Sequence, residues 1–255
     1  RMSTPSEPVS KTPSSAPVAA AAAATAPPHN PHEVDLTRWE RISSNLKTIA
    51  GAVMLALVIR TALFEAFEIE GPSMEPTLLN GDRVVVAKFA FGLFLPLRDQ
   101  ADVVWGQPHV GDVVIIKSPA DGVDIVKRVI GVGGDFIEMR ADRVYRNGKP
   151  LPMVDAGPCK QGVGSLQPDC RVYHSKIDEH DFLMSTARIM PDPSPVHVPK
   201  GDIYVLGDHR DHSNDSRNPM VGAIPINRVK GRALAIYWSS GPEGLRYPRM
   251  FHAVL

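Results

Sequence analysis

The sequence predicts a mostly β extracytoplasmic domain with an inserted smaller lobe, preceded by one transmembrane helix and a disordered N-terminal tail. Three observations predict this fold class. The chain opens with a stretch rich in proline, alanine and serine, one long apolar run follows it, and short apolar runs between turn residues make up the rest. With 255 residues, of which 43% are hydrophobic, the chain can build one sizeable core with appendages.

The N-terminal segment, residues 1–43, is predicted to be a disordered tail on the cytoplasmic side. Its first 34 residues contain no aromatic residue and show no apolar periodicity. Such a segment cannot bury enough apolar surface to offset the entropy that is lost on ordering. Its alanine run is too weakly hydrophobic, and lacks the basic flank, for a secretory signal.

Residues 44–67 are predicted to form the transmembrane helix. The apolar run covers residues 46–67, close to the roughly 20 residues that a spanning helix needs, and its centre carries no charge. Arg38, Arg41 and Lys47 lie on its N-terminal side, which places the N-terminus in the cytoplasm and the remaining chain outside. A buried core helix is the alternative, because the uncharged centre is short.

The part of the chain after the apolar run is predicted to be all-β. Its short apolar runs are bounded by Gly, Pro, Asp or Asn, and they cover residues 82–92, 111–119, 123–139, 142–151, 201–208 and 231–239. The pair Asn147-Gly148 between two such runs predicts a hairpin. We expect the main β domain to comprise residues 68–139 and 201–255. Residues 150–200 are less regular and proline-rich, and residues 140–200 are predicted to form the inserted lobe.

The chain contains two cysteines, Cys159 and Cys170, both in the predicted lobe. Because the domain is expected outside the reducing cytoplasm, a disulfide between them is plausible, and two free thiols are the alternative. A zinc site is less favoured, since two cysteines do not complete a set of ligands.

The charge balance argues against nucleic acid as a partner. Lysine and arginine together number 28, as do aspartate and glutamate, so the formal net charge is zero. A protein that binds nucleic acid usually shows a basic excess or stripe.

Ser73, in the stretch EGPSMEPTLLNGD, is either a turn residue or a nucleophile. A serine nucleophile needs a positioned base, and no histidine, cysteine or lysine lies within ten residues of it. The nine histidines leave a Ser-His-Asp triad open, although the sequence around Ser73 lacks the second glycine of a G-x-S-x-G elbow. A metal-bound water would need ligands such as His209 and His212, whose spacing suits a helix. Their surroundings are too rich in Asp, Asn and Gly for one, so no metal is predicted.

A lysine is the remaining candidate base. It can accept a proton only when neutral, and burial in apolar surroundings favours that form. In an extended strand Ile125, Lys127 and Val129 point to the same side, so Lys127 would be the polar group on an apolar face. A lysine at a strand edge that reaches water would fit the same pattern.

Three ordered sequence boxes resemble those of bacterial type I signal peptidases, which are membrane-anchored Ser-Lys endoproteases. GPSMEPTLLNGD is similar to the family's Ser-Met-x-Pro-Thr-Leu box, DIVKRVIGVGGD to its Lys-Arg-x-x-Gly-x-x-Gly-Asp box, and GDHRDHSNDSR to its Gly-Asp-x-Arg-Asp-x-Ser-x-Asp-Ser-Arg box. Their order, their spacing and the preceding apolar segment all match. The resemblance covers residues 49–239.

The resemblance implies roles for individual residues. Ser73 is expected to be the nucleophile, Lys127 the general base, and Ser213 the residue that hydrogen-bonds to the lysine and orients it. The expected supports of the site are Met74, Arg128, Asp208, Arg210, Asp211, Asp215 and Arg217. For residues 207–217, the third box, an ordinary polar turn without a role in catalysis is the alternative interpretation.

The chain departs from common family patterns at two places. Gly71 stands where many members carry a serine that helps to bind the oxyanion, so the backbone N–H of Ser73 is expected to do so. His209 and His212 stand where the family usually has asparagine. They are expected to replace its hydrogen bonds, and the alternative is that they make the site sensitive to pH.

The implied function is the removal of N-terminal signal peptides from exported preproteins, without a cofactor. The expected location is the bacterial cytoplasmic membrane, crossed once, with the catalytic domain outside. Expected partners are preproteins, the lipid bilayer and the export machinery. Two alternatives remain open: another Ser-Lys protease, and a non-catalytic membrane-anchored β scaffold that binds exported peptides.

Overall fold

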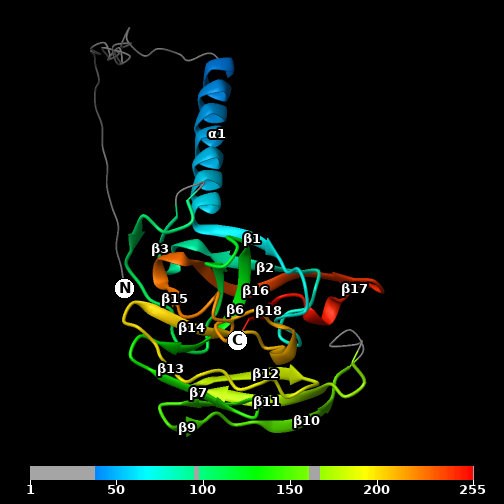
Figure 1. Cartoon of the computed structure of the whole chain (residues 1–255). Coiled ribbons are helices and arrows are strands. Elements are labelled where there is room, and N and C mark those ends of the chain that lie inside the picture. The colour runs from blue at the N-terminus through cyan, green and yellow to red at the C-terminus, as the bar shows by residue number, and fades with distance from the viewer. Residues whose placement is uncertain (1–37, 95–97, 161–166, 255) are drawn as a thin grey trace, which may run out of the picture. The chain divides into compact units, whose positions relative to one another are not determined.

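The computed structural model describes residues 38–94, 98–160 and 167–254. Residues 1–50 and 51–255 form two units, and the second contains every described strand. The predicted mostly β architecture is therefore confirmed (Figure 1).

Helix α1 comprises Arg38–Leu63. It begins six residues before the predicted start, so residues 38–43 of the predicted tail are helical, and residues 1–37 lie outside the described part of the chain. It also ends four residues before the predicted end. The predicted end is wrong because Phe64–Glu68 forms strand β1, whose backbone pairs antiparallel with the next strand instead of continuing the helix.

No helix among the described residues is long and apolar enough to cross a membrane. The predicted transmembrane span is thus not confirmed.

The main sheet has nine antiparallel strands, with the order β1-β2-β16-β5-β6-β14-β15 and with β17 and β18 paired to β16. Its strands are β1, β2 (Asp82–Ala87), β5 (Val113–Lys117), β6 (Asp124–Val132), β14 (Asp202–Leu206), β15 (Ile224–Pro225), β16 (Val229–Gly241), β17 (Gly244–Leu245) and β18 (His252–Ala253). The long strand β16 joins both halves of this sheet, since it pairs with β2 and with β5.

The remaining strands form three smaller sheets. One contains β13 (Val196–His197), β7 (Phe136–Arg140), β8 (Arg143–Arg146) and β9 (Lys149–Pro150). The second contains β10 (Val154–Pro158), β11 (Arg171–Ile177) and β12 (His180–Thr186), and the third β3 (Gly92–Leu93) and β4 (Val103–Val104). Four 3₁₀ turns are η1 (Lys88–Ala90), η2 (Arg210–His212), η3 (Ile226–Arg228) and η4 (Tyr247–Arg249).

The sheets formed by β7–β13 correspond to the predicted inserted lobe, but they begin at Phe136 instead of residue 140. After β6 the chain leaves the main sheet at Gly134, which has φ +100°, and its N–H donates to the carbonyl of Val198. A conformation with positive φ suits glycine because it lacks a Cβ. Residues 136–140 therefore belong to the lobe's four-stranded sheet.

The lobe and the main sheet share one hydrophobic core. Buried side chains of the lobe, including Ile137, Met139 and Phe182, pack with Ile130 of β6 and Leu206 of β14. Two further buried clusters cover the rest of the main sheet. Strands β6 and β14 therefore contribute side chains to the cluster shared with the lobe and to a cluster of the main sheet. Most of the predicted site residues lie on these two strands or next to them in sequence.

Two local predictions concern the lobe. The Asn147-Gly148 hairpin is confirmed, because β8 pairs with β9 and both turn residues have positive φ (+53° and +77°), as a type I′ turn requires. Cys159 and Cys170 form a disulfide. It ties the end of β10 to the residue before β11.

Candidate active site

Ser73 lies in the loop that connects β1 to β2. Its neighbour Met74 is only 1% exposed and packs with Leu78 in the buried cluster beneath the loop. The Glu75 N–H donates to the carbonyl of Pro72, and the Leu78 N–H donates to the carbonyl of Met74. The loop is therefore a compact turn with its apolar side chains anchored in the core.

The backbone at Gly71 has φ +82°, a left-handed conformation. A Cβ at this position would have no other atom within 4 Å, so space does not restrict the residue but the backbone conformation does. A serine at this position would sit in a strained backbone.

We therefore expect Gly71→Ser to lower the free energy of unfolding by about 1 kcal/mol, the cost of a left-handed L-residue. Urea denaturation of the variant and the wild type would measure the difference. Gly122→Ser is a matched comparison, because Gly122 also has positive φ (+69°) and an open Cβ position but lies outside this loop. If the backbone conformation sets the cost, both variants should lose a similar amount of stability. An unchanged stability of Gly71→Ser would contradict the backbone argument.

Lys127 lies on β6 and brings its amine to Ser73. The distance between Lys127 Nζ and Ser73 Oγ is 2.8 Å, although the two residues are 54 positions apart. Ile125 and Val129, its neighbours on the same face of the strand, pack into a hydrophobic cluster, and Lys127 itself is 3% exposed. The strand thus holds a lysine in apolar surroundings at hydrogen-bond distance from one hydroxyl.

Burial lowers the pKa of Lys127 from its usual value near 10.5 to about 8. The nearby charges of Asp215 and Asp208 act in the opposite direction and Arg217 adds to the lowering, but the loss of hydration dominates. A substantial fraction of the amine is therefore neutral at mildly alkaline pH. In that state the Ser73 hydroxyl donates its hydrogen bond to the amine, which is the geometry a general base needs.

The hydrogen bond between Ser213 and Lys127 that the resemblance implies is not formed among the described residues. The lysine amine donates to the carbonyl of Val126 at 2.8 Å, while the buried Ser213 hydroxyl has no hydrogen-bond partner in the described chain. Ser213 packs against Gly207, where an added Cβ would lie 2.2 Å from its hydroxyl oxygen. Its close neighbour is therefore the Gly207 backbone.

Arg128 and Asp208 form an ion pair below the site, with both side chains fully buried. Arg128 Nε and Nη2 donate to the two carboxylate oxygens of Asp208 at 2.9 and 2.8 Å, and Nη1 donates to the Gly111 carbonyl. The guanidinium also lies over the ring of Phe182, 4.4 Å from its centre. This pair joins β6 to the end of β14.

Asp215 and Arg217 form a second pair, in the turn after η2. Arg217 donates from Nε and Nη2 to the carboxylate of Asp215, each at 2.8 Å. Asp215 also accepts from the N–H of Gly207 at 2.9 Å, and Arg217 donates to the carbonyl of Arg210. Arg210 is 1% exposed, and burial lowers its pKa to about 10. These contacts hold the turn in one conformation.

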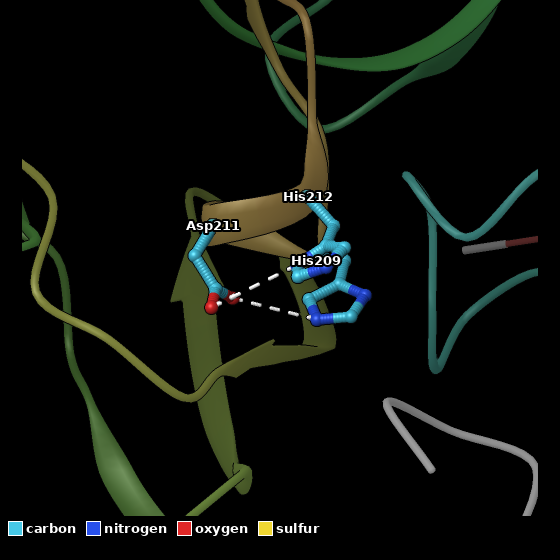
Figure 2. Close-up of side chains that lie close together, drawn as sticks. All are labelled: His209, Asp211 and His212. Carbon is cyan, nitrogen blue, oxygen red and sulfur yellow. Dashed lines mark ion pairs between the residues drawn. The ribbon is translucent and has the colours of Figure 1, made fainter. Parts of the chain in front are cut away.

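Asp211, His209 and His212 lie together on η2 and the residue before it (Figure 2). The His209 N–H donates to the Ser73 carbonyl at 3.1 Å, so this turn also holds the loop that contains Ser73. Burial lowers the pKa of His209 below its usual 6.5. The His212 ring stacks on that of His209, with 4.6 Å between the ring centres.

Sequence reasoning missed three residues that support the site. The Thr77 hydroxyl donates to Asp208 at 2.6 Å, and Ser185, in the lobe, donates its hydroxyl to the Glu75 carbonyl and its N–H to the Asp208 carbonyl. A Cβ on Gly207 would lie 2.4 Å from the Ser73 carbonyl oxygen. Thr77 and Gly207 belong to the boxes quoted above, whereas no pattern around Ser185 indicates its contact.

A cleft of about 450 Å³ opens at Ser73 and Lys127. One wall consists of residues 67–70 and the other of residues 123–127, and the buried side chains of Ile69, Met74 and Val126 form its apolar part. In the described sheet β1 is an edge strand, and β6 pairs with β14 only from Arg128 onward. Each wall therefore presents a backbone edge to the cleft.

Comparison with known proteins gives a family. The model described as "Signal peptidase, peptidase S26" matches residues 42–238. A signal peptidase I from Pseudomonas fluorescens is 34% identical over 220 residues, which cover 81% of this chain and 74% of that protein. One from Bacillus licheniformis is 34% identical over 193 residues, covering 76% of this chain and 87% of the relative. All three sequence boxes lie within residues 42–238, and the chain belongs to the signal peptidase family, peptidase S26.

Proposed function

We propose that Ser73 and Lys127 are the nucleophile and the general base with which this chain, a signal peptidase, removes signal peptides from exported preproteins. The 2.8 Å approach of the buried Lys127 amine to the Ser73 hydroxyl is the observation that carries the proposal. His209, whose backbone N–H donates to the Ser73 carbonyl, directs Nδ1 at the Pro72 carbonyl and not at the serine hydroxyl.

The proposed reaction needs only the residues of this site. Neutral Lys127 accepts the proton of Ser73 as Oγ attacks the scissile carbonyl carbon, and it then gives that proton to the leaving amine. Water hydrolyses the resulting ester, and the same amine accepts the proton of the water. The Ser73 N–H, which has no acceptor among the described residues, is available to stabilise the oxyanion.

The substrate is proposed to bind as an extended strand in the cleft between residues 67–70 and 123–127. Both walls offer backbone groups to such a strand, as in other cases of β-strand addition. Next to Ser73 the cleft is lined by the large buried apolar side chains of Ile69, Met74 and Val126, which we expect to leave room only for small substrate side chains. This supports cleavage after small residues, such as an Ala-x-Ala pattern.

The test is cleavage of a purified preprotein by the full chain in detergent. The expected product begins after the small residues of the signal peptide, as N-terminal sequencing would show. Ser73→Ala should reduce cleavage to background, whereas Ser240→Ala, at a half-buried serine outside the cleft, should leave it unchanged. Full cleavage by Ser73→Ala would exclude Ser73 as the nucleophile.

We further propose that the domain acts at a membrane surface, with the apolar run of α1 as its anchor and the site on the extracytoplasmic side. A patch of exposed apolar side chains supports contact with lipid, because the surfaces of soluble proteins rarely carry large contiguous apolar patches. Its members are Phe64, Phe89, Leu93, Val103, Val104 and Trp105. Phe64 and Phe89 contact each other edge to face, at 5.8 Å between ring centres.

Polar substitution in this patch should separate membrane contact from chemistry. Leu93 and Val103 are paired across β3 and β4 and are 46% and 54% exposed. We expect the double variant Leu93→Asn/Val103→Asn to cleave a vesicle-bound preprotein several-fold more slowly but a soluble peptide at the wild-type rate. Equal rates on the vesicle-bound substrate would show that the patch does not contact lipid.

A further inference from the structure

Three potential metal ligands meet on one turn beside the nucleophile loop. One donor atom from each of His209, Asp211 and His212 lies within 4.8 Å of the others. The distance between His209 Nε2 and Asp211 Oδ1 is 3.4 Å, and that between His212 Nδ1 and Asp211 Oδ2 is 3.8 Å. Figure 2 shows both imidazoles on the same side of the turn, facing the carboxylate.

The partners of His209 determine which ring nitrogen is free. Its Nδ1 lies 3.2 Å from the Pro72 carbonyl oxygen, which can only accept a hydrogen bond, so Nδ1 carries the proton. Glu75 lies 3.7 Å from the same nitrogen. Ligating histidines commonly donate their other nitrogen to a carbonyl or a carboxylate in this way, which directs the Nε2 lone pair outward.

The lone pair of His209 Nε2 faces a carboxylate without a donor between them. Both His209 Nε2 and Asp211 Oδ2 are buried and lack a hydrogen-bond partner in the described chain. Asp211 Oδ1 accepts only a long bond, 3.3 Å, from the Ala187 N–H, and Arg188 lies 3.7 Å from Oδ2 on a side chain that is 70% exposed. Two acceptors held this close repel each other unless a proton on Nε2 or a metal cation lies between them.

We propose that His209, Asp211 and His212 bind a divalent transition-metal ion, and that Zn²⁺ fits this donor set best. Two imidazoles and one carboxylate are typical zinc ligands, with water in the open position. Ligands at about 2.1 Å from a tetrahedral ion lie about 3.4 Å apart, which matches the His209–Asp211 distance. The two rings are nearly parallel, and the Gln167 amide nitrogen lies 3.1 Å from His212 Nδ1, so the partly exposed His212 ring must tilt and exchange this contact for the ion.

The site is distinct from the dyad but is connected to it. The backbone N–H of His209 donates to the Ser73 carbonyl, and its ring donates to the Pro72 carbonyl. An ion that fixes the His209 ring therefore stabilises the turn on which the nucleophile loop rests.

Isothermal titration of the full, tag-free chain in detergent with ZnCl₂ tests the proposal without reference to cleavage. We expect one ion per chain and a rise in the melting temperature with ion concentration. His212→Asn, which restores the family residue, and Asp211→Asn should each weaken binding by at least about 10-fold. His252→Asn, at an exposed histidine outside the cluster, should bind as the wild type does.

A titration with Co²⁺ provides an independent signature. Its visible absorption reports coordination by nitrogen and oxygen ligands, and we expect it in the wild type and in His252→Asn but not in His212→Asn. Circular dichroism would establish that each variant is folded. The proposal is overturned if the wild type binds no ion, or if folded His212→Asn and Asp211→Asn bind Zn²⁺ as tightly as the wild type.

Discussion

Replacing Lys127 by methionine is expected to reduce preprotein cleavage by about 10⁴-fold, the upper range for the loss of a general base. Methionine has a similar length and keeps the apolar contacts of β6, but it cannot accept the proton of Ser73. The wild-type rate should in turn rise with pH as the amine, with its pKa of about 8, loses its proton. Initial rates between pH 6 and pH 9 would show this ascending limb.

The same substitution should make the protein more stable near neutral pH. The folded state lowers the pKa of Lys127 from about 10.5 to about 8, so between these values the unfolded chain binds a proton that the folded chain does not. Below pH 8 the folded protein must hold a buried ammonium, which costs on the order of 3 kcal/mol. Lys127→Met removes that cost, and the lost hydrogen bond to the Val126 carbonyl offsets about 1 kcal/mol of the gain.

Urea denaturation of both proteins at two pH values tests this linkage. At pH 7 the variant should be more stable than the wild type, and the difference should shrink as the pH approaches 10.5, because the wild type gains stability from pH 8 upward. Comparing the two proteins at each pH cancels the titration of all other groups. A difference that does not depend on pH would mean that the amine is not desolvated in the folded state.

The contact between Ser73 and Lys127 could be expected from sequence because several of its requirements are local. Alternation along β6 places Lys127 on an apolar face whatever the strand pairs with, and the apolar residues around Ser73 indicate a loop anchored in a core. The resemblance to the family then indicated that the box with Ser73 and the box with Lys127 contribute to the same site. The 2.8 Å distance itself depends on how β6 and the β1–β2 loop pack, and no sequence pattern encodes it.

The lobe shows where sequence reasoning was insufficient. Residues 150–200 were expected to be irregular, yet β11 and β12 are regular seven-residue strands. Their turn, at Asp178 with φ +50°, lacks the glycine that usually marks a hairpin, and polar side chains such as Ser175 and Ser185 occupy buried positions. Buried serines hide the period-two pattern, because they are recognised as core residues only through tertiary hydrogen bonds.

Asp208→Ala is expected to destabilise the fold by about 3–5 kcal/mol, the range for removing one partner of a buried ion pair. The fully buried Arg128 guanidinium would lose the carboxylate with which it forms this ion pair. The Thr77 hydroxyl, which donates to Asp208 at 2.6 Å, would lose its acceptor as well. Thermal or urea unfolding would measure the loss.

The exposed pair of Arg171 and Asp155 is a matched control. Both side chains are 46% exposed, so Asp155→Ala should cost much less stability than Asp208→Ala. The double variant Arg128→Met/Asp208→Leu should recover much of the stability lost in Asp208→Ala, because it leaves no buried charge without a partner. A cost for Asp208→Ala as small as that for Asp155→Ala would contradict the burial argument.

The ion pair should also affect catalysis, because its two residues adjoin the site in sequence. Arg128 follows Lys127 on β6, and Asp208 precedes His209, whose N–H holds the Ser73 carbonyl. In a folded double variant we expect kcat to fall more than KM rises, since the cleft walls remain but the spacing between amine and hydroxyl is less well fixed. An unchanged kcat would mean that the packing of β6 against the nucleophile loop suffices without the pair.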